Sequence, residues 1–387
     1  AAPDLKAFLE RQLHSNERYE KLRRVLARYR EIAAQGGWEL IPDGETLKPG
    51  MSDWRVPVIR RRLYLTDSLK SDGLSSTAYD EQLVEAVRHF QMRYGLDVDG
   101  VLGKETREAM NVPVEAVIRR IIVNMERWRW LPHDLDGVRV GVNIAGFDLG
   151  VFKDLRLEMQ MPVIVGKTYH KTPIFSDLIK YIEFNPYWNI PPSIARNEML
   201  PRLKQDPRYL VERNIRLFSG WGADARELDS TTVDWRGVSG KQMNRYKFRQ
   251  DPGLKNALGT VKFMFPNDYN VYLHDTPSHS LFTRPERTFS HGCIRVSKPA
   301  ELASYLLGGE ENGWGIERVM EAINSRKRTV VPLDKPIPII IAYRTVWLDS
   351  EGNVRFNKDV YGRDSILEKA LFEDQLWLAP PPKEDVS

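Results

Sequence analysis

The hydrophobic pattern of this chain changes once, near Pro132, and that change limits the folds available to it. Before Pro132, apolar residues recur at intervals of three and four, as on one face of a helix. After Pro132 they alternate with polar residues or run together, as in Val138–Ile144 and Leu155–Val165, which is typical of strands. We therefore predict an α+β protein, helical at first and then mainly antiparallel β to about residue 348.

The helical part divides into three stretches. Residues 1–36 are predicted to form a helix that ends at Gly36-Gly37 and is followed by a connector rich in proline and glycine over 39–56. A compact helical segment follows to residue 112, and another helix covers 113–130. The apolar stripes of these three helical stretches are Tyr19, Leu22, Leu26, Tyr29 and Ala33; Leu83, Val87, Phe90 and Tyr94; and Ile118, Ile121, Ile122 and Met125.

The β part is interrupted over residues 191–256. This stretch begins with Pro191-Pro192, has helical spacing around 194–213 and carries an Arg- and Gly-rich run, Trp235–Arg249. Because long insertions between strands are often functional, we predict a helical lid here. The elements predicted after the lid are strands at 261–265 and 271–274, helices at 299–307 and 315–325, a hairpin of Ile337–Leu348 with Val354–Phe356, a helix near 365–372 and a Pro-rich tail.

Composition excludes several classes of protein. A net charge of +4 over 387 residues is too small to indicate nucleic-acid binding. No apolar run approaches the roughly 18 residues of a membrane span. The chain opens on Ala1 without a methionine or signal peptide, so we expect a processed or truncated product. Cys293 is the single cysteine, which excludes an internal disulfide.

Cys293 lies in Ser290-His291-Gly292-Cys293-Ile294-Arg295-Val296, which favours a nucleophile over a buried bystander. A thiol needs a base within roughly 2.6–3.2 Å, and His274, at the end of a predicted strand, is the candidate. The amides of Gly292 and Cys293 could form an oxyanion hole, and His291 is either a further donor or structural. Arg295 points to the same side as Cys293 if the segment is extended, and is either a carboxylate ligand or part of an ion pair. Tyr272 shares a face with His274 and either shapes a channel or packs.

Two families resemble parts of this chain. Residues 57–112 resemble the peptidoglycan-binding domain, a three-helix module, through Ala86–Gln91, Tyr94-Gly95-Leu96 and an Asp-Gly-x-x-Gly-x-x-Thr run from Asp99. His274, sixteen intervening residues and then His291-Gly292-Cys293, with Ser290 before them and Arg295 after, match the signature of the L,D-transpeptidases, which have a YkuD-type β catalytic domain. Asn185–Pro191 is similar to a family segment that lines the substrate channel, which makes Asn185 and Trp188 candidate substrate contacts. Lys171-Thr172-Pro173 is similar to the family's Thr-Pro element but lacks the glycine that often follows.

The insertion and the upstream module point to the YcbB-like branch. The resemblance implies that Cys293 attacks the carbonyl of the L-centre diamino acid in a stem tetrapeptide, releases D-alanine and forms a thioester. An amine of a second stem then yields a 3→3 cross-link. His274 would be base and acid, oriented by the backbone carbonyl of Asp275, and Ser290 would be a substrate contact. No metal or organic cofactor is implied. The expected partners are peptidoglycan stems and glycan, with carbapenems as inhibitors, and other envelope partners stay unidentified. Such proteins are usually periplasmic and anchored to the inner membrane, through a segment that this chain lacks.

Three alternatives remain from the residues. His274, His279, His291 and Cys293 could be zinc ligands of a hydrolase, although zinc would not explain Gly292. The chain could instead be a non-catalytic wall-binding scaffold. The same acyl-enzyme could also serve an L,D-carboxypeptidase or attach an envelope lipoprotein; a lid that excludes water favours an amine acceptor.

We predict four parts: a helical scaffold and connector (1–56), the peptidoglycan-binding module (57–112), the catalytic domain (113–348) with its lid insertion, and a C-terminal part (349–387) that could pack on the scaffold.

Overall fold

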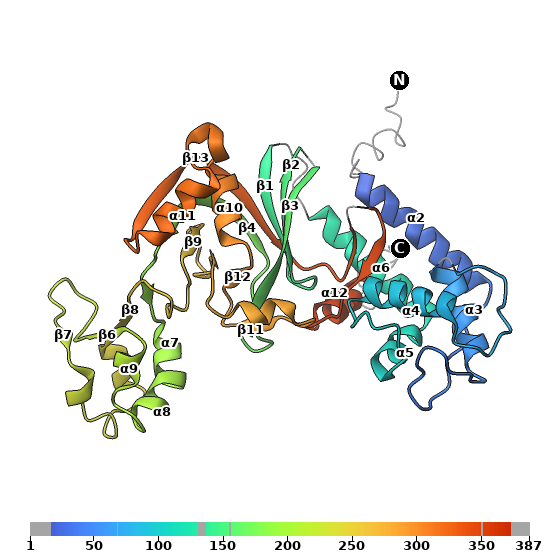
Figure 1. The fold of residues 1–387 in the computed structure, drawn as a ribbon, viewed down its shortest axis with the longest axis horizontal. Helices are drawn as coiled ribbons and strands as arrows, with labels where there is room; N and C mark the ends of the chain where they lie inside the picture. The colour runs from blue at the N-terminus through green and yellow to red at the C-terminus, as the bar shows by residue number, and fades with distance from the viewer. Residues whose placement is uncertain (1–16, 68, 131–136, 155, 350, 373–387) are drawn as a thin grey trace, which may run out of the picture. The chain divides into compact units, whose positions relative to one another are not determined.

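The computed structural model describes residues 17–67, 69–130, 137–154, 156–349 and 351–372. The start of the first predicted helix, Pro132 and the Pro-rich tail lie outside these residues. The chain forms two compact units, one of residues 1–135, 143–146 and 343–387 and one of residues 136–142 and 147–342 (Figure 1). The mixed helical and mainly antiparallel β fold predicted from the sequence is confirmed.

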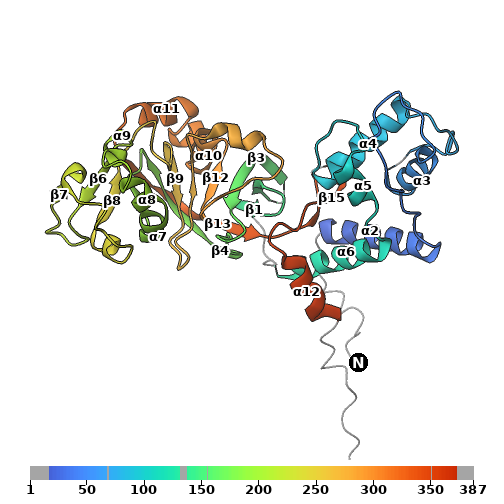
Figure 2. The same cartoon turned by 90° about the horizontal axis from the view of Figure 1, so that it is seen from below.

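The first unit is helical, with one small hairpin (Figure 2). Its helices are α2 (Glu17–Ala34), α3 (Val56–Thr66), α4 (Glu81–Tyr94), α5 (Lys104–Met110), α6 (Val114–Arg129) and α12 (Arg363–Phe372). Its hairpin pairs β14 (Val346–Leu348) with β15 (Val354–Phe356). The predicted hairpin is therefore shorter than expected, because Ile337 lies in a longer strand of the other unit.

One apolar core joins both ends of the chain in this unit. Helices α2, α4 and α6 contribute most of it, and the hairpin adds Val346, Leu348 and Phe356. The ring of Phe356 stacks on Tyr94 at 4.8 Å and meets Tyr29 edge-on at 6.0 Å. The β14–β15 hairpin therefore packs on helices α2 and α4.

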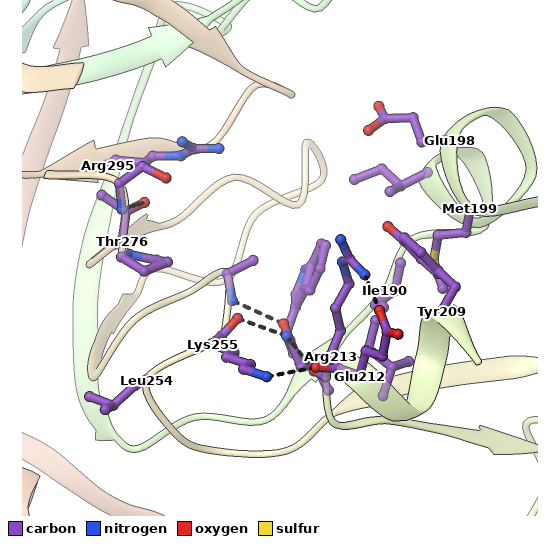
Figure 3. A pocket seen from close by; sticks show the side chains of 17 residues that line it. Ile190, Glu198, Met199, Tyr209, Glu212, Arg213, Leu254, Lys255, Thr276 and Arg295 are labelled. Atoms are coloured by element: carbon purple, nitrogen blue, oxygen red, sulfur yellow. Dashed lines mark hydrogen bonds and ion pairs between the residues drawn. The ribbon is translucent and has the colours of Figure 1, made fainter. Parts of the chain in front are cut away.

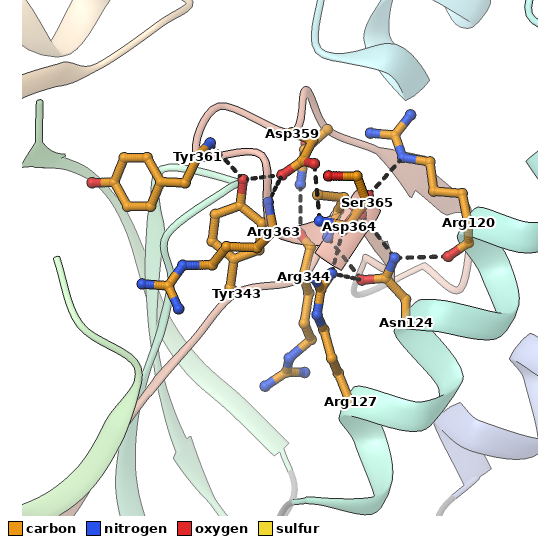
Figure 4. Close-up of polar contacts among 12 residues, drawn as sticks. Arg120, Asn124, Arg127, Tyr343, Arg344, Asp359, Tyr361, Arg363, Asp364 and Ser365 are labelled. Atoms are coloured by element: carbon orange, nitrogen blue, oxygen red, sulfur yellow. Dashed lines mark hydrogen bonds and ion pairs between the residues drawn. The ribbon is translucent and has the colours of Figure 1, made fainter. Parts of the chain in front are cut away.

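A buried polar network ties α12 to α6 (Figure 4). Arg127 of α6 pairs with Asp364 at 2.5 Å, and the other oxygen of that carboxylate accepts from the Thr345 hydroxyl at 2.6 Å. Asn124 exchanges hydrogen bonds with the same threonine at 2.8 and 2.9 Å. Helix α6 was predicted to open the catalytic domain. It instead packs against α2 and α12 in this unit, because its apolar face and its buried arginine both find partners there.

The second unit is built on a nine-stranded sheet in the order β11-β3-β12-β10-β9-β4-β13-β1-β2, in which β2 also pairs with β3, so the sheet closes on itself. Its strands are β1 (Val138–Asn143), β2 (Asp148–Lys153), β3 (Arg156–Gly166), β4 (Phe175–Phe184), β9 (Val261–Met264), β10 (Leu273–His274), β11 (Thr288–Ser290), β12 (Ile294–Val296) and β13 (Thr329–Ala342). Most neighbours are antiparallel, and β10 with β12 and β11 with β3 are parallel. Two helices, α10 (Pro299–Leu306) and α11 (Ile316–Asn324), follow β12.

The insertion between β5 and β9 folds around a small core of its own that includes Trp235, Leu203 and Phe248. Its helices, predicted from the sequence, are α7 (Pro192–Ile194), a five-residue π-helix η1 (Ala195–Met199), α8 (Leu200–Leu203) and α9 (Tyr209–Glu212). The structure adds a four-stranded sheet that the sequence analysis did not predict. It comprises β5 (Trp188–Asn189), β8 (Lys247–Gln250), β6 (Ile215–Phe218) and β7 (Glu227–Leu228), in that order.

None of the described helices combines the length and the hydropathy needed to span a bilayer.

Candidate active site

Strands β10 and β12 bring the predicted chemistry together. They run parallel, with Leu273 opposite Ile294 and His274 opposite Arg295. At the start of this pairing, the backbone amide of Ile294 donates a hydrogen bond to the backbone carbonyl of Tyr272 at 3.1 Å. Because side chains alternate along a strand, Tyr272 and His274 share one face with Cys293 and Arg295.

The turn before Cys293 is held by two hydroxyl groups. Ser290 Oγ accepts from the Gly292 amide at 3.1 Å and donates to the Cys293 carbonyl at 2.5 Å. Gly292 has a φ of 115°, which disfavours any residue with a side chain. The buried Thr172 hydroxyl donates to the Gly292 carbonyl and accepts from the Gly166 amide, both at 2.9 Å. Ser290 and Thr172 therefore shape the turn that presents the thiol.

This turn corrects one prediction. The Gly292 amide was expected to form an oxyanion hole with the Cys293 amide, yet it already donates to Ser290. The Cys293 amide makes no hydrogen bond within the described part of the chain, so it is the backbone donor still open beside the thiol.

Cys293 is partly exposed, and its Sγ lies 3.8 Å from the carbonyl oxygen of Asn270. Burial raises the pKa of the Cys293 thiol. Hydrogen bonds from the backbone and side chain of Tyr272, and the positive charges of Lys262 and Arg295, act in the opposite direction on that pKa. Burial therefore opposes ionisation of the Cys293 thiol, whereas Tyr272, Lys262 and Arg295 favour it.

His274 is buried, and its Nδ1 lies 2.5 Å from the carbonyl oxygen of Asp275. A carbonyl can only accept, so Nδ1 carries the proton and Nε2 keeps its lone pair in the neutral ring. Burial, with Arg295 and Lys262 nearby, lowers the pKa of His274 to about 3, against smaller opposing effects of the Asp275 and Leu258 carbonyls. The ring is therefore a neutral imidazole at ordinary pH.

His274 and Cys293 make no hydrogen bond with each other in the described structure. The direct contact predicted between base and thiol is thus absent here, because the ring is held against backbone carbonyls.

The carboxylate of Asp275 fixes the loop behind His274. It accepts from the Thr260 amide at 2.8 Å, the Thr260 hydroxyl at 2.9 Å and the Thr276 amide at 2.7 Å. Gly259 has a φ of 62°, and a Cβ there would lie 2.3 Å from the Asp275 carboxylate. The side chain of Asp275 is thus structural, and its carbonyl faces the imidazole.

A pocket of about 810 Å³ lies between the insertion and the end of β12 (Figure 3). Arg295 and Thr276 line one side, and Glu198, Met199 and Tyr209 of the insertion line the other. Trp188, a predicted substrate contact, also lines it. The Nε of Arg295 is buried and has no hydrogen-bond partner, which leaves the guanidinium a donor for an incoming carboxylate.

Asn185 does not lie in this pocket. Its side-chain amide donates to the carbonyls of Ala322 and Lys327 at 2.9 and 3.2 Å, and the residue is buried. The predicted substrate contact is therefore replaced by a structural role, because both amide protons are occupied.

The histidines of the zinc alternative go to different places. His291 contacts Glu198 of the insertion, and its ring centroid lies 5.1 Å from that of His170. His279 is exposed and lies 4.0 Å from the Asp275 carboxylate. Over the described residues, no three His, Cys, Asp or Glu side chains gather into a group that could hold a metal ion.

Lys262 is the neighbour of this site that the sequence analysis missed. It lies on β9, opposite His274, with its Nζ 4.0 Å from the centre of the Tyr272 ring. The signal available in the sequence was a lysine between Val261 and Phe263 in an otherwise apolar strand.

The family model described as L,D-transpeptidase catalytic domain (YkuD) matches residues 137–331. The chain belongs to the L,D-transpeptidase family. A second model, named "Putative peptidoglycan binding domain", matches residues 58–110. A curated Haemophilus influenzae protein named "Putative L,D-transpeptidase" is 34% identical over 254 residues, 66% of this chain. The chain spans about half the length of that relative.

Solved structures of L,D-transpeptidases also match, at low similarity. One from Xylanimonas cellulosilytica is 15% identical, with a TM-score of 0.24, over 78% of this chain and 98% of that one. One from Stackebrandtia nassauensis is 13% identical, with a TM-score of 0.26, over 79% and 98%. At these scores the two structures add no argument to the family assignment.

Proposed function

We propose that the protein is a cysteine acyltransferase that forms 3→3 cross-links in peptidoglycan. The observation that carries this proposal is the shared face of Tyr272, His274, Cys293 and Arg295. Of these four residues, Arg295 also lines the pocket between the insertion and β12. A nucleophile, a neutral base and an unpaired guanidinium on one face meet the needs of acyl transfer from a peptide.

In the first step the Cys293 thiolate attacks the carbonyl carbon of the L-centre at position three of a donor stem. The Cys293 amide, which makes no hydrogen bond within the described residues, is the proposed donor for the oxyanion that forms, with the Tyr272 phenol on the same face as a second. The C–N bond to D-alanine breaks, the departing amine takes a proton through His274, and a thioester remains. Because His274 makes no direct contact with Cys293, its ring turns or works through a water during this step.

In the second step an amine of the acceptor stem attacks the thioester, its proton passes to His274, and the C–S bond breaks to release the Cys293 thiolate. We propose that the insertion acts as a lid that favours this amine over water. Two observations support the lid role. Glu198 contacts His291, which is two residues from the nucleophile, and Glu198 also lines the pocket. A π-helix such as η1 often marks a functional position in a helix.

The Arg295 guanidinium, which reaches the pocket, would bind a stem carboxylate, and Trp188 would contact the peptide. Peptidoglycan glycan is the proposed ligand of residues 57–112. A carbapenem, whose strained carbonyl acylates a thiolate, is the proposed inhibitor. The cell envelope, on the periplasmic side of the inner membrane, is the proposed location.

Incubation of the protein with a donor tetrapeptide stem, with and without an acceptor stem, tests the function. We expect free D-alanine and a cross-linked dimer when both stems are present. Tripeptide alone, at the same rate with or without acceptor, would identify an L,D-carboxypeptidase and overturn the transpeptidase proposal.

A further inference from the structure

Lys262 belongs to a row of ionisable side chains that crosses four strands. The row runs from Arg295 on β12 through His274 on β10 and Lys262 on β9 to Glu183 on β4. Each member is directly opposite the next, so all four side chains share one face of the sheet. Glu183 also pairs with Arg328 at 2.5 Å.

The Lys262 ammonium lies over the Tyr272 ring, 4.0 Å from its centre, and makes no hydrogen bond or ion pair within the described residues. Tyr272 in turn lies beside Cys293 on the neighbouring parallel strand, with both side chains on one face. Lys262 is thus directed toward the nucleophile, with the aromatic ring as its platform.

Burial lowers the pKa of Lys262, and Arg328 adds to that effect, while Glu183 and Cys293 favour the charged ammonium. The same attraction between Lys262 and Cys293 lowers the pKa of the thiol. The other groups that lower the pKa of Cys293 are Tyr272 and Arg295, on the same face of the sheet. His274 is neutral, so it supplies no positive charge to a thiolate.

We propose that Lys262 is a positioning residue for this reaction: across the Tyr272 ring it supplies the positive charge that favours the thiolate of Cys293, a charge that the neutral imidazole of His274 does not provide. This inference rests on the proposed function, since it assigns a purpose to an ionised Cys293. Three residues then have different roles at the site. Lys262 favours the thiolate, His274 moves the proton and Arg295 is free to bind substrate.

The test is the pH dependence of Cys293 alkylation by iodoacetamide, which requires a thiolate and no substrate. Lys262→Met is expected to shift the profile by about one pH unit to higher pH, which makes alkylation at pH 7 about tenfold slower. Lys262→Arg, which keeps the charge, should follow the wild type. Lys180→Met is the matched control, because Lys180 is exposed on the opposite face of β4. A Lys262→Met profile that overlaps the wild type would overturn the proposal.

A reciprocal measurement leaves Lys262 in place, in case its loss prevents folding. Electrostatic coupling acts equally on both partners, so an ionised Cys293 must raise the pKa of Lys262. We expect the NMR titration of isotopically methylated Lys262 to give a lower pKa in Cys293→Ala than in the wild type. Equal values in the two proteins would overturn the inference.

Carbapenem acylation separates this inference from the proposed function. If the wild type forms no carbapenem adduct while Lys262→Met still shifts alkylation, the acyltransferase proposal fails and the role of Lys262 stands. If the wild type is acylated and Lys262→Met leaves the alkylation profile unchanged, the acyltransferase proposal stands and the role of Lys262 fails.

Discussion

The protonation states at the site follow from burial. Burial and the nearby cations Arg295 and Lys262 keep the His274 ring neutral, against the opposing effect of two backbone carbonyls. Cys293, in contrast, is partly exposed and lies near Tyr272 and cationic side chains. A neutral base beside a thiol that needs help to ionise suits an enzyme that takes the proton only when substrate arrives.

The neutral His274 predicts how stability depends on pH. The pKa of His274 is about 3 in the folded protein and near 6.5 when unfolded, so the unfolded chain binds more protons in between. Stability is therefore retained above pH 6.5 and lost as pH falls toward 3, by up to about 1.4 kcal/mol per pH unit. Denaturant unfolding at several pH values should show this slope in the wild type and a shallower one in His274→Gln. Equal slopes would contradict the neutral assignment.

Thr172 supports the nucleophile turn from a buried position. Thr172→Val keeps the shape but leaves the Gly292 carbonyl and the Gly166 amide without their partner, which should cost about 1–3 kcal/mol of unfolding free energy. Acylation of Cys293 by a carbapenem should also slow. Thr260→Val, which removes one of several bonds to Asp275, is the matched comparison and should cost less. Wild-type stability and acylation rate in Thr172→Val would contradict this role.

The residues that sequence could predict are those with a fixed local pattern. The string from Ser290 to Arg295 and the strand alternation of Tyr272 and His274 place four side chains on one face. Asn185 and Lys262 could not be assigned in this way, because their partners come from distant segments: the end of α11 for Asn185, and β10 with β4 for Lys262.

At the scale of elements, Glu198 of the insertion contacts His291 of the nucleophile turn. Glu198→Gln should weaken that pair, admit water and raise the ratio of tripeptide to cross-linked dimer, by roughly tenfold if the pair holds the lid closed with about 1.4 kcal/mol. Asp234→Asn, an exposed change on the same insertion, is the control and should leave the ratio unchanged. An unaltered ratio in Glu198→Gln would contradict the lid role.

The insertion also shows where element prediction stops. Its helices carry enough periodic apolar residues to be predicted, whereas β5 and β7 have two residues each and show no alternation. The small sheet exists because distant strands and Trp235 bury a common core, which is a tertiary effect.

At the scale of the whole molecule, the chain leaves its helical unit, forms the β unit and returns. The sequence pattern of residues 346–356 predicts a strand pair but not what that pair packs against. Its partners in the helical unit, Tyr29 and Tyr94, lie more than 250 residues earlier in the chain. The four-part division by sequence stays a proposal beside the two compact units of the structure.

Separate cores predict separable effects on stability and chemistry. Phe356→Ala should remove about 3–5 kcal/mol from the helical unit, since it empties the site between Tyr29 and Tyr94. The rate of carbapenem acylation at Cys293 should stay at the wild-type value, because Phe356 belongs to the other core. Denaturant unfolding and acylation kinetics on one preparation check both points. Unchanged unfolding, or acylation slowed in proportion, would contradict the separation.

The central claim, that Cys293 carries the acyl group, is tested most directly by intact-mass measurement after the protein is mixed with a donor tetrapeptide stem or a carbapenem. We predict one covalent adduct, mapped to the peptide that contains Cys293, absent in Cys293→Ala and formed about 10²–10⁴-fold more slowly in His274→Ala. An adduct that persists in Cys293→Ala would contradict the claim.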